Sequence, residues 1–372
     1  MPGKILVTGG AGFIGSHVVE LLLEKGRDVV VYDALVDQVH RGAGPVNVPN
    51  DAKFVHGDMR DRAAVASALE GVEAVVHLAA EVGVGQSMYE ISRYVDANTS
   101  GTGVLLDVIA NQPTDIERIV VASSMSIYGE GAYVCAEHGE VHPHLRSSAQ
   151  LEARDWDPRC PRCGEPVTPI GTHELKPLRP TSVYAISKMD QELLCLSVGG
   201  AYDIGVVALR YFNAYGPRQA LSNPYTGVAA IFSSRLLNGR APLAFEDGQQ
   251  LRDFIHVRDV ARATVTALES PAADGEAINV GTDDPMTVTA VARSLASALG
   301  VDLEPELTGT ARAGDIRHCY ADMSKADALL GFRPEIDFDT GVSELIEWVS
   351  AQQAHDLVDR AQRELAARGL AR

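Results

Sequence analysis

Residues 4–33 read KILVTGGAGFIGSHVVELLLEKGRDVVVYD and carry the strongest structural signal in the chain. Two short apolar runs, 4–9 and 28–33, enclose a stretch with helical periodicity at 13–26. The apolar residues of that stretch fall on one side of a helix: Ile14, Val18, Leu21 and Leu22. The pattern predicts a β-strand, an α-helix and a second β-strand in succession.

The same alternation continues along the chain. AVVHLA (74–79), RIVVASS (118–124) and Val206–Arg210 are further short and almost wholly apolar runs. Such strands are typical of a parallel sheet that helices cover on both faces. Because the crossovers between parallel strands are right-handed, the sequence predicts an α/β fold with a doubly wound parallel sheet of the Rossmann type.

Helical periodicity returns in the second half of the chain. Stretches 226–238, 287–299 and 341–368 are expected to be helical. At the end of the last stretch, apolar residues recur at helical spacing: Leu357, Ala361 and Leu365. We expect this terminal helix to pack on the body of the protein.

The loop between the first strand and the first helix is glycine-rich: residues 8–15 read TGGAGFIG. Glycines allow the backbone to approach a pyrophosphate closely, and a helix N-terminus offers it free N–H groups. Asp33 ends the second strand, where a carboxylate accepts hydrogen bonds from both ribose hydroxyls and repels a 2′-phosphate. These features favour NAD over NADP. Asp58, after the third strand, is either an adenine contact or a helix cap.

Composition and charge exclude several classes of function. The 372 residues are 46% apolar and 22% charged, as in a globular protein, and the net charge is −18. An acidic surface repels nucleic acid and anionic lipid, so neither is an expected partner. The sequence has no apolar run of membrane-spanning length and does not begin like a signal peptide. With only five cysteines, a cytoplasmic location is expected.

Tyr184 and Lys188 are four residues apart in a predicted helix, so both side chains share one face. A nearby ammonium group favours the phenolate form of tyrosine and thereby makes it a usable base. Ser123 and Ser124 stand at the carboxyl end of the strand 118–124, where doubly wound sheets bind their ligands. The sequence therefore predicts a catalytic site at this edge of the sheet.

These motifs and several others resemble the extended short-chain dehydrogenase/reductase family, and more narrowly its nucleotide-sugar epimerases and dehydratases. The matching segments, which stretch from residue 8 to about 334, are TGGAGFIG, Asp33, HLAA (77–80), Asn98, SSMSIYG (123–129), YAISK (184–188), RYFNAYGP (210–217), GQQLRDFIHVRDV (248–260), NVG (279–281), RAGDIRH (312–318) and GFRP before the final helices.

The resemblance implies a role for each matching residue. Tyr184 would remove the hydroxyl proton of a sugar, Lys188 would hold the nicotinamide ribose, and Ser124 would bind the reacting oxygen. The NAD contacts it implies are Gly9, Gly12, Phe13, Ile14, Gly15, Asp33, Asp58, Met59, Leu78, Ala79, Ala80, Asn98, Ser123, Tyr184, Lys188 and Tyr211. The contacts that the resemblance implies for the nucleotide sugar are Ser87, Ser124, Ser126, Asn213, Arg252, Arg312 and Asp315.

The resemblance also implies a division of the chain. Residues 1–209 would form the NAD-binding domain, with an insertion at 131–172. Residues 210–372 would mainly form a smaller α/β domain that binds the nucleotide sugar, with 253–282 returning to the first domain. Family members pair as homodimers through a four-helix bundle. Here the helices at about 92–111 and from Tyr184 to about Val198 are the expected partners.

Dehydratases of this family carry an Asp–Glu pair after the catalytic Ser or Thr, but here Met125 and Ser126 occupy those positions. Neither side chain can serve as the acid or base that removes water. The decarboxylases' Glu is also missing. We therefore expect a 4-epimerase that oxidises and re-reduces C4; a dehydratase or a 4-ketoreductase is the alternative. The segment 79–90 and the insertion resemble those of epimerases acting on dTDP-L-rhamnose.

The insertion contains a pattern typical of structural zinc sites. Cys135 and His138 form one pair and Cys160 and Cys163 the other, the second followed by glycine as in zinc-ribbon knuckles. Three thiolates and an imidazole would close a tetrahedral shell, although free thiols in a loop are the alternative, as are His142 and His144 as ligands. Because both ends of the insertion lie near catalytic segments, we expect a flap over the sugar pocket.

Overall fold

The computed structural model describes residues 3–312, 314–352 and 355–370. Its largest element is a seven-stranded parallel sheet with the strand order β13-β9-β5-β4-β1-β2-β3. The strands are β1 (Lys4–Thr8), β2 (Asp28–Asp33), β3 (Lys53–His56), β4 (Val72–His77), β5 (Arg118–Ser124), β9 (Gly205–Tyr211) and β13 (Glu276–Val280). The chain order runs outward from β1 in both directions, which confirms the predicted doubly wound sheet.

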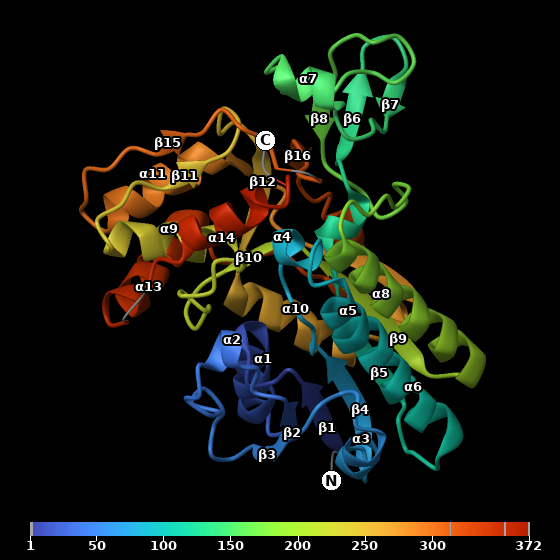
Figure 1. Ribbon diagram of the computed structural model, residues 1–372. Helices are drawn as coiled ribbons and strands as arrows, with labels where there is room; N and C mark the ends of the chain where they lie inside the picture. The colour runs from blue at the N-terminus through green and yellow to red at the C-terminus, as the bar shows by residue number, and fades with distance from the viewer. Residues whose placement is uncertain (1–2, 313, 353–354, 371–372) are drawn as a thin grey trace.

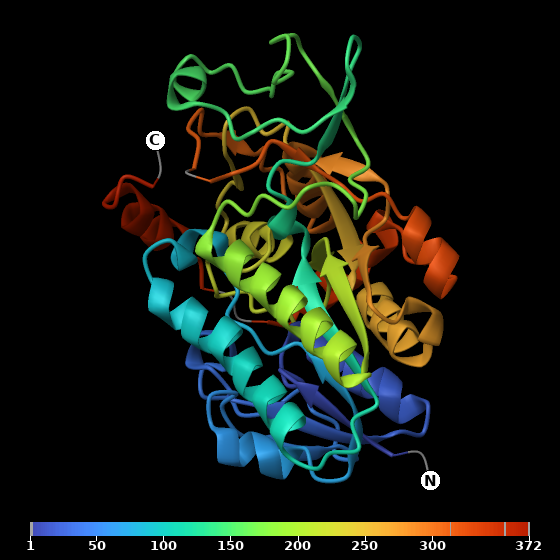
Figure 2. The ribbon, with the colours of Figure 1, turned by 90° about the vertical axis from the view of Figure 1, so that its right-hand side faces the viewer.

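Helices cover both faces of the sheet (Figures 1 and 2). The first face packs against α1 (Phe13–Glu24), α10 (Val257–Glu269) and α12 (Ser324–Leu330). The second packs against α3 (Arg62–Ala68), α6 (Gly101–Asn111) and α8 (Val183–Tyr202). Within β1, Ile5 and Val7 point into the first core and Leu6 into the second. Since both faces are buried, the strands are apolar throughout.

A smaller α/β unit lies beyond the carboxyl ends of the strands. Its main sheet joins β10 (Asn213–Tyr215), β12 (Leu251–His256), β14 (Pro285–Thr287) and β16 (His318–Cys319), and β11 (Leu243–Ala244) pairs with β15 (Glu306–Leu307). Three helices share its core: α9 (Val228–Leu237), α11 (Val288–Ala298) and α13 (Phe338–Ser350). Helices α9 and α11 confirm the predicted helices at 226–238 and 287–299.

Short elements complete the main body. They are α2 (Asp37–His40), α4 (Val84–Ser87), α5 (Ile91–Tyr94), the π-helix η1 (Val95–Ser100), and the 3₁₀-helices η2 (Met125–Tyr128) and η3 (Pro271–Ala273). Elements α5, η1 and α6 follow one another as one long rod beside α8 (Figure 2).

The insertion stands out from the body as a small unit of its own (Figure 1). It contains the antiparallel sheet of β7 (Gly139–Val141), β6 (Ala132–Cys135) and β8 (Thr168–Ile170), and the helix α7 (Ser148–Glu152). Its buried core is very small: Tyr133, Cys135, Val141 and Cys160. So little apolar burial supplies little folding free energy.

The prediction of one helix over 341–368 is wrong. Helix α13 ends at Ser350, and a second helix, α14 (Val358–Ala366), follows. Asp356 lies between them, where its buried carboxylate accepts ion pairs from Arg235 at 3.3 Å and Arg240 at 2.9 Å. These contacts fix the chain outside helical geometry. Helix α14 nevertheless packs on the body as expected, with Ala361 and Leu365 buried.

Among the described residues, no helix is both long enough and apolar enough to cross a membrane.

Candidate active site

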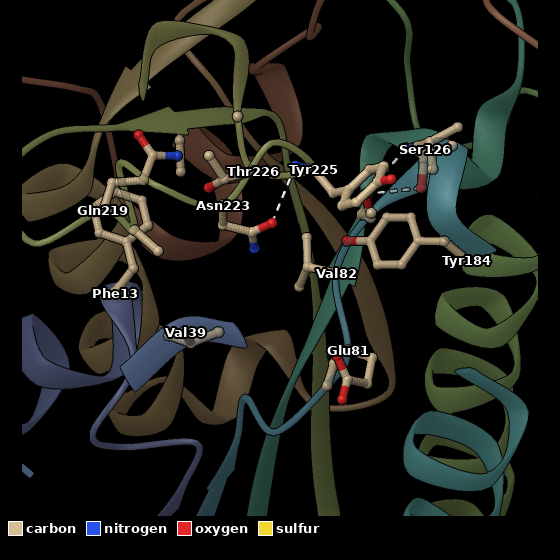
Figure 3. A pocket seen from close by; sticks show the side chains of 18 of the residues that line it. Phe13, Val39, Glu81, Val82, Ser126, Tyr184, Gln219, Asn223, Tyr225 and Thr226 are labelled. Carbon is tan, nitrogen blue, oxygen red and sulfur yellow. Dashed lines mark hydrogen bonds between the residues drawn. The ribbon is translucent and has the colours of Figure 1, made fainter. Parts of the chain in front are cut away.

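A cavity of about 660 Å³ lies between the carboxyl end of the large sheet and the smaller α/β unit. Figure 3 shows Tyr184 and Ser126 on one side and Phe13, Val39 and Gln219 across from them. The predicted site residues that line it are Gly9, Gly12, Phe13, Ile14, Gly15, Asp33, Asp58, Met59, Leu78, Ala79, Ala80, Ser123, Ser124, Ser126, Tyr184, Lys188, Tyr211, Asn213, Arg252, Arg312 and Asp315. The fold thus brings together residues that are more than 300 positions apart in the sequence.

The glycine-rich loop forms one end of the cavity. Asp33 fixes it, because one carboxylate oxygen accepts a hydrogen bond from the Ala11 N–H at 3.0 Å and the other from Leu35 N–H at 2.8 Å. The loop packs tightly on itself: a Cβ at Gly15 would lie 2.2 Å from the Gly9 carbonyl oxygen. Only glycine therefore permits this loop beside the start of α1, and the N–H groups there remain open to an anion.

Several buried polar atoms of the cavity have no hydrogen-bond partner among the residues that the structure describes. They are Ser123 Oγ, Asn213 Oδ1, Gln219 Oε1 and Gln250 Oε1. Unpaired buried polar groups are costly unless something else satisfies them. These atoms, the glycine cradle and the Asp33 carboxylate together fit a large polar ligand such as a dinucleotide with a second polar molecule beside it.

We expect Gly15→Ala to weaken NAD binding by roughly 10- to 100-fold, because the added methyl group must displace the loop backbone. NAD content after purification and calorimetric titration measure the effect. Gly103→Ala on α6 is the matched control, since a Cβ there meets nothing within 4 Å. Equal NAD binding by both variants would contradict the role of the loop.

Ser182 caps the N-terminus of α8 by accepting a hydrogen bond from the Ala185 N–H at 3.1 Å, and so fixes where Tyr184 enters the cavity. Burial raises the pKa of Tyr184, and its hydrogen bond with Ser124 lowers that pKa in part. Ser126 Oγ donates to Ser124 Oγ at 2.9 Å. Three hydroxyl groups that can carry protons thus line the same cavity.

Lys188 is buried one helical turn after Tyr184, and burial lowers its pKa to about 7. Its Nζ donates to Gln191 Oε1 at 2.6 Å, and Gln191 Nε2 donates to Thr102 Oγ1 at 2.9 Å. His77 continues this buried network to Thr8 at the end of β1, with its Nδ1 2.7 Å from the threonine hydroxyl. The ammonium group is therefore held in place by polar partners rather than by a carboxylate.

Two arginines also line the cavity. Arg252 donates to the backbone carbonyls of Ile316 at 2.7 Å and Arg317 at 2.9 Å, while Arg312 donates to the Asp315 carboxylate at 2.9 Å. These guanidinium groups lower the pKa of Asp315 against the raising effect of burial. Two fixed guanidinium groups in an acidic protein provide the local positive charge that a diphosphate requires.

Ser87 and Asn98 are not among the residues that line the cavity, and their ligand contacts stay predictions. Ser87 Oγ accepts a hydrogen bond from the Tyr184 N–H at 3.0 Å, and therefore helps to position the start of α8. Asn98 Oδ1 accepts from the Glu81 N–H at 2.7 Å, and its Nδ2 donates to Ser187. Asp58 lines the cavity and pairs with Arg60, while the cap of α3 is Asp61.

Some cavity residues were not predicted from the sequence. Asn223, Tyr225 and Thr226 belong to a turn before α9 that lines the cavity (Figure 3). Helix α14 adds a further wall with Val358, Ala361, Gln362 and Leu365. Its Glu364 accepts hydrogen bonds from the Tyr89 and Tyr225 hydroxyls at 3.0 and 2.9 Å. Neither segment carries a motif that marks a ligand site, although the helical spacing of Ala361 and Leu365 predicted that the terminal helix packs on the body.

The insertion is not a flap over this cavity, since no residue of 131–172 lines it. The expected flap is not seen, because the insertion projects outward from its base beside β16 (Figure 1). The predicted metal ligands do come together: Cys135, His138, Cys160 and Cys163 have ligand atoms within 4.8 Å of one another. The alternative ligands point elsewhere, with His142 paired to Glu140 and His144 beside Arg179.

A doubly wound sheet with a glycine-rich first loop and a Ser–Tyr–Lys set at its carboxyl edge defines an extended short-chain dehydrogenase/reductase. The model of the NAD dependent epimerase/dehydratase family matches residues 5–148 and 161–281. The dTDP-L-rhamnose 4-epimerase of Burkholderia thailandensis is 38% identical over 94% of this chain and 95% of its own length. A dTDP-glucose 4,6-dehydratase of Actinoplanes sp. is 30% identical over 94% of this chain and 99% of its own.

Among solved structures, the UDP-glucose 4-epimerase of Thermus thermophilus in complex with NAD aligns with a TM-score of 0.75 and 31% identity, over 94% of this chain and all of that chain. The chain belongs to the NAD-dependent epimerase/dehydratase family. It is an NAD-dependent enzyme of the nucleotide-sugar epimerase type.

Proposed function

We propose that this enzyme inverts C4 of a dTDP-linked 6-deoxyhexose, with dTDP-L-rhamnose or a related dTDP-sugar as substrate. The similarity to the Burkholderia thailandensis dTDP-L-rhamnose 4-epimerase supports this choice of substrate. Because a dehydratase is also among the relatives, the reaction itself must be argued from the cavity.

The observation that carries the proposal is the lack of a free carboxylate in the described residues beside Ser124. The two following residues, Met125 and Ser126, line the cavity and offer no carboxylic acid. Its carboxylates are those of Asp33, Asp58, Glu81 and Asp315. Each is engaged with backbone N–H groups or an arginine. Elimination of water needs an acid and a base near C5 and C6, whereas epimerisation at C4 does not.

The chain's own residues supply the proton chemistry. Tyr184 takes the proton of the C4 hydroxyl, Ser124 binds the same oxygen, and Lys188 favours the phenolate form. NAD, which the glycine-rich loop, Asp33 and Lys188 would hold, would supply the hydride acceptor for C4. Between oxidation and re-reduction of C4 the 4-keto sugar must present its other face, while Arg252 and Arg312 keep the diphosphate anchored. Tyr184 then returns the proton to the C4 oxygen.

Incubation with dTDP-L-rhamnose, followed by NMR, tests the proposal. We expect a mixture of the starting sugar and its C4 epimer, with no net consumption of NAD. Formation of a 4-keto-6-deoxy product from dTDP-glucose would instead identify a dehydratase. Stoichiometric oxidation of added NADH would identify a 4-ketoreductase.

The two ligands divide the chain between them. We assign NAD to residues 1–209, outside the insertion, together with 253–282, and the nucleotide sugar mainly to the remaining part of 210–372. The glycine-rich loop after β1 and Arg252 on β12 line the cavity from different sheets, which supports this division.

The enzyme is expected to be a homodimer through a four-helix bundle. Helix α8 and the α5–η1–α6 rod lie side by side (Figure 2). Their outer surface carries large apolar side chains that are 39–53% exposed: Ile91, Val95, Ile186 and Leu193. Such a patch is unusual on a monomer and supports an interface.

Light scattering should therefore give twice the chain mass of 39.7 kDa. Leu193→Lys should shift the protein towards monomer, because it places a charge in the centre of the apolar surface. Leu175→Lys is the control, since Leu175 is 88% exposed and lies outside these helices. A monomeric wild type would contradict the bundle.

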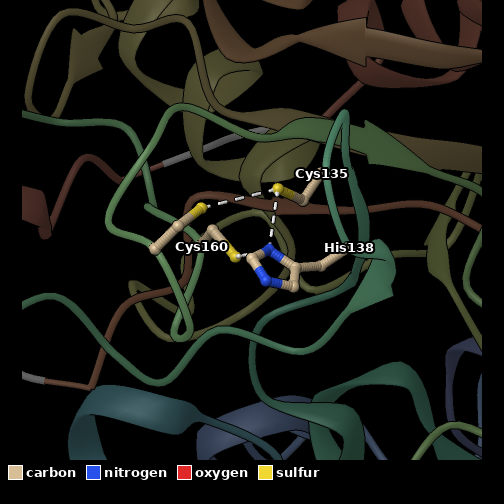
Figure 4. A group of neighbouring side chains, drawn as sticks. Cys135, His138 and Cys160 are labelled. Atoms are coloured by element: carbon tan, nitrogen blue, oxygen red, sulfur yellow. Dashed lines mark hydrogen bonds between the residues drawn. The ribbon is translucent and has the colours of Figure 1, made fainter.

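The Cys/His cluster of the insertion is assigned to one structural Zn²⁺ ion. Cys135 Sγ lies 3.6 Å from His138 Nδ1 and 3.8 Å from Cys163 Sγ, and Cys160 Sγ lies 3.7 Å from His138 Nδ1 (Figure 4). Tetrahedral zinc requires ligand separations of about 3.6 Å for S–N and about 3.8 Å for S–S pairs. With four protein ligands there is no open position for chemistry. Thiolate ligands need a reducing compartment, which favours the cytoplasm.

Elemental analysis of protein purified without chelator should find one zinc ion per chain. Cys160→Ser should lose most of the metal and lower the thermal stability of the insertion, because metal binding supplies folding free energy that its small core lacks. Cys195→Ala removes a thiol from α8 outside the cluster and should keep the metal. Zinc far below one equivalent in the wild type would overturn the assignment.

A further inference from the structure

Four charged side chains form a buried cluster between the insertion and the body. They are Glu130, Arg146, Glu246 and Arg317, and each side chain is at most 3% exposed. Arg146 Nη1 lies 2.8 Å and Arg317 Nη1 3.1 Å from the Glu246 carboxylate. Glu130 accepts the Arg317 N–H at 2.8 Å. Arg317 also pairs with Asp247 at 2.6 Å and with Asp157 at 2.9 Å, so carboxylates from several segments compensate the two buried guanidinium groups.

The cluster joins distant parts of the chain. Glu130 follows η2, which continues from catalytic Ser124, and Glu246 follows β11. Arg146 belongs to the insertion, where its Nη1 also donates to the Trp156 carbonyl at 2.9 Å. Arg317 reaches back to the insertion through Asp157, whose carboxylate accepts from its Nε at 2.9 Å. These polar contacts attach the insertion to the body. The apolar core of the insertion is small and adds little to this attachment.

Segment 315–317 accepts hydrogen bonds both from this cluster and from a cavity arginine. Arg146 Nη2 donates to the Asp315 carbonyl at 3.2 Å. Arg252 donates to the Ile316 and Arg317 carbonyls at 2.7 and 2.9 Å. The Asp315 carboxylate holds Arg312. The insertion thus contacts the same segment that holds both cavity arginines.

We propose that Arg146 is a positioning residue for the nucleotide diphosphate: it holds segment 315–317 through the Asp315 carbonyl and thereby sets the directions of the Arg252 and Arg312 guanidinium groups. The insertion supports substrate binding without touching the substrate. This inference rests on the proposed nucleotide-sugar substrate, but not on its base or sugar. It predicts that loosening the insertion impairs nucleotide binding while the chemistry at Tyr184, at the other side of the cavity, continues.

The test is Arg146→Met in the full-length enzyme with its NAD, which removes the charge and keeps most of the side-chain stem. Calorimetry measures the affinity for dTDP, UDP and GDP, which share the diphosphate. We expect the affinity for the nucleotide that the wild type prefers to fall at least tenfold. KM should rise accordingly, with kcat within threefold and NAD content unchanged. Arg146→Lys should restore part of the affinity, because it returns a charge to the cluster.

Arg159→Met is the matched control, since Arg159 is an arginine of the same insertion, half exposed, that pairs with Asp155 at the surface. It should bind nucleotide normally. Should Arg146→Met not fold, Asp157→Asn tests the same docking from a side chain that is 69% exposed. A two- to fivefold loss of nucleotide affinity is expected there. Unchanged affinity in the folded Arg146 or Asp157 variants, or an equal loss of kcat, would overturn the proposal.

Nucleotide affinity is independent of turnover, so the two proposals can fail separately. A wild-type enzyme that leaves dTDP-L-rhamnose unchanged refutes the proposed reaction, yet the affinity comparison still decides the role of Arg146.

Discussion

Tyr184→Phe is expected to reduce kcat by about 10²- to 10⁴-fold while leaving NAD content unchanged. The variant lacks the hydroxyl group that takes the proton from the sugar, but the ring still fits against Tyr94, 6.5 Å away between ring centres. In the wild type, burial raises the pKa of Tyr184, so its rate should increase with pH as the phenolate forms. The residual rate of the variant should lose this increase. Initial rates between pH 6 and 10 measure both effects.

Tyr202→Phe is the control, because Tyr202 lies at the far end of the same helix and is 54% exposed. It should show wild-type kinetics. A Tyr184→Phe enzyme that retains more than about a tenth of wild-type kcat, with an unchanged pH profile, would remove Tyr184 from the proposed proton path.

The second large effect concerns stability. Glu192 on α8 pairs with Arg210 on β9 through contacts of 2.6 and 3.0 Å, and both side chains are buried. Arg210 also donates to the Tyr128 hydroxyl at 2.9 Å. Glu192→Ala would leave the guanidinium group buried without its counter-ion. We expect the free energy of unfolding to fall by about 3–5 kcal/mol, as measured by urea denaturation.

Glu269→Ala provides the contrast. Glu269 pairs with Lys25 at 2.8 Å, but both side chains are at least 40% exposed. Water screens that pair, so its loss should change the free energy of unfolding by at most about 1 kcal/mol. Similar losses from both substitutions would mean that burial does not govern the strength of the Glu192–Arg210 pair.

The sequence predicted the large sheet well because each of its strands is a local signal. Strands β1, β2 and β5 are runs of β-branched residues that only a sheet buried on both faces explains, and the glycine-rich loop between β1 and α1 has a single structural meaning. The location of the cavity could be predicted from the fold, because the carboxyl ends of parallel strands lie at the same edge of the sheet. Cys160 and Cys163 are also close in sequence, and the glycine after them completes a local pattern that is typical of zinc-binding turns.

Features that depend on contacts between distant residues could not be predicted in this way. The break between α13 and α14 is fixed by Arg235 and Arg240, more than 100 positions before Asp356. Ser87 matched a family motif, yet its hydroxyl meets the backbone of Tyr184, 97 positions later. Neither local periodicity nor spacing within a motif indicates which distant residues pair. The buried cluster of Glu130, Arg146, Glu246 and Arg317 also joins distant residues, so the sequence could not predict it either.

The two ends of the insertion meet where it leaves the body, with the Ala132 N–H donating to Thr172 Oγ1 at 3.1 Å. The host chain therefore enters and leaves at almost one point, and the large sheet would keep its path if a short turn replaced everything between. The family model breaks off at residue 148 and resumes at 161, inside this excursion. In topological terms the insertion is a side loop closed at its base, so a change in its length need not alter the path of the strands.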